Sequence, residues 1–313
     1  PTSENDSAIF REKEDDAEGK LKVDDEVLKF FPEEAPAKPS ANLKAMRLRD
    51  LLTMAAGHHA EDLQGFSLTT DESVVKRFLA LPVAHKPGTF FAYSTAATFM
   101  QSAMVQKVTG QTVLEYLRPR LFEPLGISGM RWETCPLGIN TGGWGLSIQT
   151  EGLAKFGQLL LQKGMWNDKQ LIPAAWVDKA THFHIQQPGG DKPDRPKAKN
   201  DWLQGYGYQF WRCQNGAFRG DGAFGQFTIV IPEQDAVIVM TSENKNMQGQ
   251  LDLVWKHLLP AFDAKPLVQA DLAPLKSLKL LPPQGSKSSA IQPAKPFKLE
   301  ANDYGLSQIS LAL

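Results

Sequence analysis

The chain has 313 residues, 42% of them hydrophobic and 22% charged, which is typical of a soluble globular protein with a large core. Lysine plus arginine (34) balances aspartate plus glutamate (35), and no basic run alternates with aromatic residues as in nucleic-acid-binding proteins. No apolar stretch approaches a membrane span, and residues 1–16 are too polar for a signal peptide. We therefore expect neither nucleic acid nor membrane as a partner, and the cytoplasm is the favoured location.

The cysteines and histidines do not predict a metal site. Cys135 and Cys213 are too few for a disulfide framework, and no second cysteine or histidine stands at ligand spacing from either. The histidines include two closely spaced pairs, His58 with His59 and His182 with His184. Side chains of adjacent residues point in different directions on both helices and strands. Neither spacing therefore favours two histidines binding the same metal ion. We expect no metal ion, no cofactor and two free thiols.

Composition divides the chain into four segments. Residues 1–18 are dominated by acidic residues and lysine, which indicates a solvated start rather than a core element. Residues 19–262 carry the periodic patterns of the main domain. Residues 263–297 are rich in proline, lysine and serine, as linkers are. Residues 298–313 predict the start of a C-terminal β module, which is too small to fold alone and must dock or be incomplete.

The first part of the main domain predicts helices. Apolar residues recur at helical spacing within residues 48–54, where Gly57 is expected as the C-terminal cap. Residues 70–73 (TDES) resemble a helix start, and the apolar face that follows ends at Leu81-Pro82. Further helices are predicted from Ala96 to Gly110 and from about Thr150 to Gly164.

The second part predicts strands. Residues 186–200, with three prolines, indicate a long surface loop or lid. The runs after it are rich in β-forming residues, and the last two are joined by a predicted hairpin turn: 206–211, 227–231 and 236–240. A closing helix is expected at 251–259, ended by Pro260. Helices followed by an antiparallel hairpin favour an α+β fold with helices packed on the sheet.

Several motifs stand in a specific order. They are 48–57 (LRDLLTMAAG), 87–95 (PGTFFAYST), 108–112 (VTGQT), 121–127 (LFEPLGI), 141–146 (TGGWGL) and 153–158 (LAKFGQ). In this order they resemble the β-lactamase-related serine hydrolases, the penicillin-binding-protein-like family, over roughly residues 19–262. The resemblance implies a serine-β-lactamase-like α+β fold. It also implies a small-molecule acyl substrate, while the oligomeric state stays open.

The family's chemistry assigns a role to Tyr93. Such enzymes attack an acyl carbonyl with a serine that a lysine one helical turn later activates. A tyrosine relays protons, and a strand edge supplies a backbone N–H to the oxyanion hole. By resemblance, Tyr93 is the proton-relay residue; the alternative is a buried tyrosine packed ahead of a helix.

The substrate-binding candidates depart from the family's pattern. Thr95 stands where the family usually has asparagine, so recognition of a substrate amide is not supported. Asp221 stands where a cation or imidazole is usual, although Arg219 could partly substitute for it. Gly222 and Ala223 still allow close backbone approach. The alternative for this stretch is a glycine-rich turn between strands.

The nucleophile is not at its expected place. In the family the Ser-x-x-Lys helix lies about one helix length before the segment matched by residues 19–27, but neither Ser3 nor Ser7 has lysine three positions later. The strands expected before that helix are missing too, which favours an N-terminal deletion or divergence over a point loss. A Ser-x-x-Lys does occur at Ser73 and Lys76, in a predicted peripheral helix, and these are the weaker catalytic candidates.

The sequence therefore predicts a serine hydrolase of esters, amides or β-lactams that works through an acyl-enzyme. As written, the chain is expected to be inactive or weak, because the nucleophile motif is not found. The alternative is a non-catalytic binding or scaffold domain derived from such a hydrolase.

Overall fold

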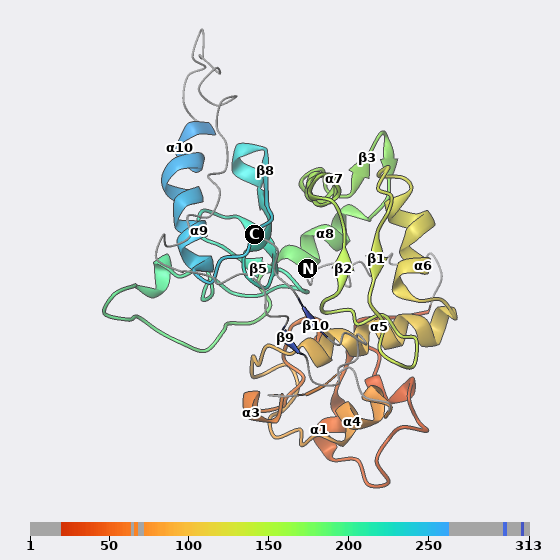
Figure 1. Ribbon diagram of the computed structural model, residues 1–313. Helices are drawn as coiled ribbons and strands as arrows, with labels where there is room; N and C mark the ends of the chain where they lie inside the picture. The colour runs from red at the N-terminus through yellow and green to blue at the C-terminus, as the bar shows by residue number, and fades with distance from the viewer. Residues whose placement is uncertain (1–19, 64–65, 68–71, 263–296, 299–307, 310–313) are drawn as a thin grey trace. The chain divides into compact units, whose positions relative to one another are not determined.

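The computed structural model describes residues 20–63, 66–67, 72–262, 297–298 and 308–309 (Figure 1). It divides into two units, Pro1–Ala264 and Lys265–Leu313. In the second unit, β9 (Phe297–Lys298) pairs with β10 (Gln308–Ile309) in antiparallel fashion. The predicted polar segment 1–18 and almost all of the predicted linker 263–297 lie outside the described residues, so those boundaries stay predictions.

The first unit begins with short helices. Their bounds are η2 (Val27–Lys29), α1 (Ala41–Ala45), α2 (Leu48–Leu52), α3 (Ala60–Leu63), α4 (Val74–Ala80), α5 (Thr95–Thr109), α6 (Val113–Leu117) and the π-helical turn η3 (Arg118–Phe122). The longest, α5, begins where the Ser94 side chain accepts a hydrogen bond from the Ala97 N–H. It ends at Gly110, whose left-handed φ of 71° suits glycine. The helix predicted from residue 96 to Gly110 is confirmed.

Strands and the remaining helices follow. They are β1 (Arg131–Trp132), β2 (Leu146–Ser147), α7 (Thr150–Leu161), β3 (Met165–Trp166), β4 (Lys169–Gln170), α8 (Ala174–Thr181), η4 (Lys197–Lys199), β5 (Trp211–Arg212), β6 (Phe218–Gly222), β7 (Gln226–Ile231), η5 (Pro232–Gln234), β8 (Ala236–Met240), α9 (Met247–Leu253), the π-helical turn η6 (Val254–Leu258) and α10 (Leu259–Phe262). The main sheet is antiparallel, in the order β5-β6-β7-β8. The predicted β7–β8 hairpin and the α+β class are confirmed.

Helices cover both faces of the main sheet. Phe227, Ile229 and Ile231 alternate along β7 and pack in one cluster with Leu251 of α9 and Val254 of η6. On the other face α7 lies against β7 and β8 (Figure 1). A Cβ on Gly157 of α7 would stand only 2.6 Å from the Val237 Cγ1 atom, so the helix approaches the sheet as closely as glycine permits.

Three predicted boundaries are corrected by the structure. Helix α2 ends at Leu52 because Met54 already turns to a left-handed φ of 57°, so Gly57 is not its cap. The predicted strand 206–211 is reduced to Trp211–Arg212, since Gln209 has a φ of 65° and interrupts the extended run. Pro260 does not end the closing helix. It is the second residue of α10, which continues the π-helical turn η6 without a break.

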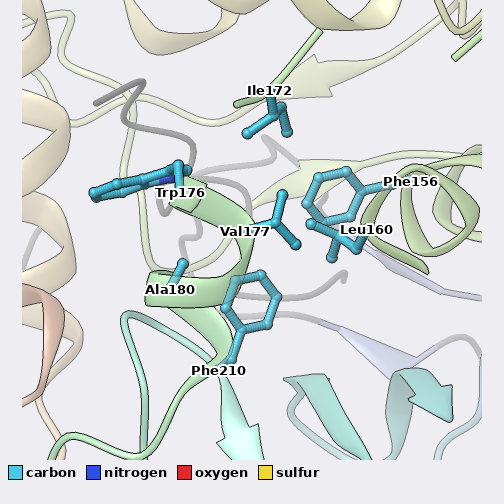
Figure 2. A pocket seen from close by; sticks show the side chains of 7 residues that line it. All are labelled: Phe156, Leu160, Ile172, Trp176, Val177, Ala180 and Phe210. Atoms are coloured by element: carbon cyan, nitrogen blue, oxygen red, sulfur yellow. The ribbon is translucent and has the colours of Figure 1, made fainter. Parts of the chain in front are cut away.

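One apolar cluster joins the short helices to α7 and α8. Figure 2 shows Phe156 and Leu160 of α7 facing Val177 and Ala180 of α8 around a small pocket. Its other lining residues are Ile172, Trp176 and Phe210. All of the lining side chains are apolar or aromatic, so this pocket is a packing gap in the core. Among the described residues, no helix has the length and apolarity needed to cross a membrane.

The predicted surface loop is anchored at two points. The Arg195 guanidinium donates to both carboxylate oxygens of Asp252, over 2.9 and 2.6 Å. Asp201 is fully buried, and its Oδ2 accepts hydrogen bonds from Gln248, Gln214 and Trp255. The loop is therefore held against α9 and η6, which argues against a freely moving lid.

Candidate functional site

Tyr93 lies between the helical part and the main sheet. Its segment is fixed to the end of α2, because the Ala92 N–H donates to the Met54 carbonyl over 2.9 Å. The Tyr93 ring stacks on the Trp211 ring of β5, with centroids 5.6 Å apart and an angle of 22°. It also meets the Tyr206 ring edge-on at 6.4 Å. Tyr93 is thus placed by aromatic contacts that come from the other half of the domain.

The Trp211 contact brings the Tyr93 segment beside β6. Trp211 pairs with Arg219 in the antiparallel register, and β5 pairs with no residue of β6 beyond Arg219. The end of β6, through Asp221 and Gly222, therefore extends past the point where β5 stops. Through Trp211, the stretch around Tyr93 is connected to β6 at Arg219, three residues before Gly222.

Thr95 is the first residue of α5 and contacts the glycine-rich stretch. A Cβ on Gly143 would stand 2.8 Å from the Thr95 Cγ2 atom, and one on Gly142 would stand 2.8 Å from the Thr98 carbonyl oxygen. Side chains at either glycine would push this stretch off α5. Glycines at residues 142 and 143 thus serve to bring it against the first turns of α5.

A buried polar link joins the same parts of the fold. The Thr98 hydroxyl donates to the Gln209 Oε1 over 3.0 Å, and Gln209 donates through Nε2 to the Leu52 carbonyl over 3.0 Å. All of these atoms lie in the interior, where an unmatched amide is costly. Gln209 therefore connects the end of α2 and the first turn of α5 to the segment that precedes β5.

Arg219 and Asp221 form a buried ion pair. The Arg219 Nε lies 2.8 Å from the Asp221 Oδ1, and Arg219 also donates to the Asp201 carbonyl over 3.0 Å. Burial raises the pKa of Asp221 to about 6, although the guanidinium acts in the opposite direction. Burial disfavours the charge of Arg219, but Asp221, Cys213 and Asp201 together more than offset this, so the pKa of Arg219 is raised. The two side chains neutralise each other inside the fold, and their role in substrate binding stays a prediction.

The β6–β7 turn carries Gly222 and Ala223. Gly222 is buried, whereas Ala223 and Phe224 are exposed. Phe224 adopts a left-handed φ of 68°, which is rare for a bulky side chain. Its carbonyl accepts hydrogen bonds from the Asn244 N–H over 2.7 Å and the Ser242 hydroxyl over 3.0 Å. The turn is thus fixed from the segment that follows β8.

The structure gives Ser73 the position of a helix cap. Its side chain accepts a hydrogen bond from the Lys76 N–H over 3.2 Å and begins α4, while the Lys76 side chain is exposed. Because Ser73 is the N-cap, its backbone is extended rather than helical. The catalytic role of Ser73 and Lys76 remains a prediction, and the cap accounts for the serine without it.

Sequence reasoning missed two residues near these groups. Trp211 could have been noticed as the last aromatic residue of 206–211, but its stacking on Tyr93 is a long-range contact. A second Ser-x-x-Lys, Ser242 to Lys245, was overlooked. It lies in the loop after β8, and the Ser242 hydroxyl also donates to the Gly225 carbonyl over 2.8 Å.

Among the described residues, no cluster of three or more potential ligands could hold a metal ion.

Comparison with known proteins connects this arrangement to one family. The sequence model of the family described as Beta-lactamase matches residues 15–258. A putative D-alanyl-D-alanine carboxypeptidase of Escherichia coli (strain K12) is 26% identical over 121 residues, which are 36% of this chain and 28% of that protein. The chain therefore aligns with little more than a quarter of that curated relative.

Two solved structures share the fold. One is a putative 6-aminohexanoate-dimer hydrolase from Bacillus anthracis, with a TM-score of 0.63 and 19% identity, covering 82% of this chain and 69% of that one. The other is EstCE1, described as a hydrolase with promiscuous acyltransferase activity, with a TM-score of 0.60, 16% identity and 80% of both chains covered. At these identities the likeness concerns the fold alone.

Proposed function

The chain belongs to the beta-lactamase family, and we propose that the region around Tyr93 and the end of β6 is an acyl-substrate site of the serine-hydrolase kind. The observation that carries the proposal is the stacking of Tyr93 on Trp211 at the end of β5. This contact sets the Tyr93 phenol beside Trp211, the residue of β5 that pairs with Arg219 of β6. Esters, amides and β-lactams share the acyl carbonyl that such a site would hold.

In this proposal Tyr93 moves a proton to or from the reacting group, and the backbone at Gly222 and Ala223 donates to the carbonyl oxygen. Thr95 lies two residues after Tyr93, at the start of α5, and contacts the substrate through its hydroxyl. Arg219 and Asp221 act from within the fold, because their ion pair fixes the conformation of β6. A strand that does not move keeps its N–H groups aimed at the developing charge.

We also propose that the chain as given hydrolyses acyl substrates weakly or not at all. The Ser73 oxygen is used as a helix cap, and the Ser242 hydroxyl is used to hold the β6–β7 turn. Within the part of the chain that the structure describes, neither hydroxyl is hydrogen-bonded to a lysine amine that could activate it. Without an activated serine, a site of this kind loses on the order of 10⁶ in kcat.

The test is covalent labelling with a fluorophosphonate probe and turnover of a short-chain nitrophenyl ester and a chromogenic β-lactam. Labelling is read by intact mass and peptide mapping. Wild type is compared with Ser73→Ala, Ser242→Ala and Tyr93→Phe. Ser73→Asp is the matched control, because aspartate keeps the cap but has no hydroxyl nucleophile.

We expect no labelling and slow or absent turnover in every variant. Rapid turnover lost in both Ser73→Ala and Ser73→Asp would overturn the inactivity proposal and make Ser73 the nucleophile. Labelling of another serine would overturn inactivity and relocate the nucleophile. If no serine is labelled, the proposed site is supported by saturable binding of a substrate ester that Tyr93→Phe weakens. The absence of any such binding contradicts the proposed site.

A further inference from the structure

Two histidines far apart in the sequence meet at the surface of the first unit. His59 and His85 are separated by 26 positions, yet the His59 Nδ1 and the His85 Nε2 lie 3.1 Å apart. Their rings meet edge-on, with centroids 4.6 Å apart and an angle of 82°. His59 is exposed and His85 is half-buried, so the pair lies at the surface. The pair lies outside the groups assigned to the acyl-substrate site.

The backbone holds this pair in place. The His85 N–H donates to the Gly57 carbonyl over 2.9 Å, and the Gly88 N–H donates to the Ala55 carbonyl over 2.8 Å. A Cβ on Gly57 would stand 2.4 Å from the His85 carbonyl oxygen, so only glycine allows the two segments to come this close. The segments that carry the histidines are therefore fixed relative to each other.

The ring of His85 is also oriented. It stacks on Phe90, with centroids 4.2 Å apart and an angle of 20°. This stacking restricts rotation of the imidazole and keeps its Nε2 directed at His59. The backbone of both histidines and the ring of His85 are thus already fixed. The pair therefore loses little conformational entropy when a ligand binds to both nitrogens.

The spacing of the two nitrogens suits a shared metal ion. Imidazole nitrogens bind Zn²⁺ at about 2.0–2.1 Å, so two of them at angles between octahedral and tetrahedral lie about 2.9–3.4 Å apart. We propose that the His59 Nδ1 and the His85 Nε2 form a two-histidine site for a divalent transition-metal ion. Because no cluster of three potential ligands occurs among the described residues, water or a small ligand fills the other positions.

The donor set selects the class of metal. Two imidazoles without a carboxylate disfavour Mg²⁺ and Ca²⁺, which take oxygen ligands. Cu²⁺, Ni²⁺ and Zn²⁺ accept imidazole, and Cu²⁺ should bind most tightly. The metal replaces the proton that one ring otherwise donates to the other, so acidification should release it.

The test is titration of the whole chain with CuCl₂ and with ZnCl₂ by calorimetry, together with pulsed electron paramagnetic resonance of the Cu²⁺ complex. The resonance spectrum counts the coordinated imidazoles and does not depend on enzymatic activity. The variants are His59→Ala and His85→Phe; the latter keeps an aromatic ring on Phe90 but removes the nitrogens. The matched control is His182→Ala, from a second histidine pair whose ring centroids are 6.3 Å apart.

We expect one Cu²⁺ bound by two imidazoles in wild type and in His182→Ala. Each of the two site variants should weaken binding at least tenfold and show a single imidazole or none. The proposal is overturned if wild type shows one imidazole only, if the site variants bind as tightly as wild type, or if His182→Ala weakens binding as much as they do. None of these results depends on whether the chain hydrolyses acyl substrates.

Discussion

Arg219 and Asp221 face each other from alternate positions on β6, with the Nε and Oδ1 atoms 2.8 Å apart and both side chains almost wholly out of solvent. Alternate residues of a strand project from the same face, so the pair is formed within one strand. Arg219 further donates to the Asp201 carbonyl and lies over the Trp202 ring at 4.7 Å. The ion pair therefore connects the strand of the proposed site to the anchored loop.

Removing one partner of this pair should destabilise the protein severely. Asp221→Ala leaves the Arg219 guanidinium buried without the carboxylate that it pairs with, and we expect a loss of about 3–5 kcal/mol in the free energy of unfolding. The double variant Arg219→Met/Asp221→Leu leaves no charge unpaired and should lose less. Urea denaturation of both variants measures the difference. A double variant that is less stable than Asp221→Ala would show that the hydrogen bonds of Arg219 outweigh the charge effect.

The stability of the fold should fall in acid because of His58. This residue is 1% exposed, and burial lowers its pKa to about 4 from an ordinary value of 6.5. The neutral ring is favoured in the folded state, so the stability it contributes is complete above pH 6.5 and is lost as the pH falls through 4. A difference of this size corresponds to at most about 3 kcal/mol.

The measurement is the free energy of unfolding at pH 7 and at pH 4.5 for wild type and His58→Leu. Neither ring nitrogen of His58 has a hydrogen-bond partner among the described residues, so leucine should be tolerated. We expect a smaller pH dependence in His58→Leu than in wild type. The exposed His257, changed to glutamine, is the control and should leave the wild-type pH dependence in place. An equal change in the free energy of unfolding between pH 7 and pH 4.5 in wild type and His58→Leu would show that His58 is not the cause of the acid sensitivity.

Gly157→Ala should destabilise the contact between α7 and the sheet. Alanine is favoured over glycine in a helix by about 1 kcal/mol, but its Cβ would stand 2.6 Å from Val237 Cγ1 and 3.0 Å from Thr228 Cγ2. We expect the clash to prevail, with a net loss of about 1–2 kcal/mol in thermal or urea unfolding. Adding Val237→Ala to Gly157→Ala should recover part of this loss. If Gly157→Ala alone is stabilising, the helix can move away from the sheet more easily than we argue.

Phe224→Gly should stabilise the β6–β7 turn. A bulky residue at a φ of 68° costs of order 1–3 kcal/mol, while glycine adds entropy to the unfolded chain. We expect a net gain of about 1 kcal/mol in the free energy of unfolding. The control Phe183→Gly removes a phenylalanine of similar exposure, 46% against 47%, whose φ is not left-handed. It should bring no gain, and equal gains in both variants would attribute the effect to loss of exposed aromatic surface.

Local patterns predicted the elements whose ends are set locally. The Ser94 cap and Gly110 lie at the ends of α5, and the β7–β8 hairpin follows from two β-rich runs around Pro232. Boundaries set by distant contacts were not predictable in this way. The run 206–211 alternates like a strand, yet the Gln209 N–H donates to the Leu52 carbonyl over 3.0 Å and turns the chain. Pro260 follows a π-helical turn, which no spacing rule indicates.

The candidate site was accessible from the sequence only in part. Family resemblance singled out Tyr93 and Gly222, and the structure links Tyr93 to the strand of Gly222 only through Trp211, so their roles stay predictions. The resemblance gave no indication that Arg219 and Asp221 would be buried. The sequence spacing of the histidines draws attention to residues 58 and 59 and to residues 182 and 184. The pair that the structure brings together is His59 with His85, where Gly57 allows the two segments to approach closely. Contacts of this kind depend on tertiary structure.

The two anchors of the loop at residues 186–205 also decide where the chain can be lengthened. Arg195 and Asp201 divide the loop into short spans, and the cost of closing a span grows only slowly with its length. Gly190 lies in the first span, and a side chain added there would meet no atom within 4 Å. A peptide tag or a small domain inserted at Gly190 should therefore leave both anchors intact. The same insertion within Lys197–Lys199 would interrupt η4 and the hydrogen bonds that its carbonyls accept from Arg195 and Gln204.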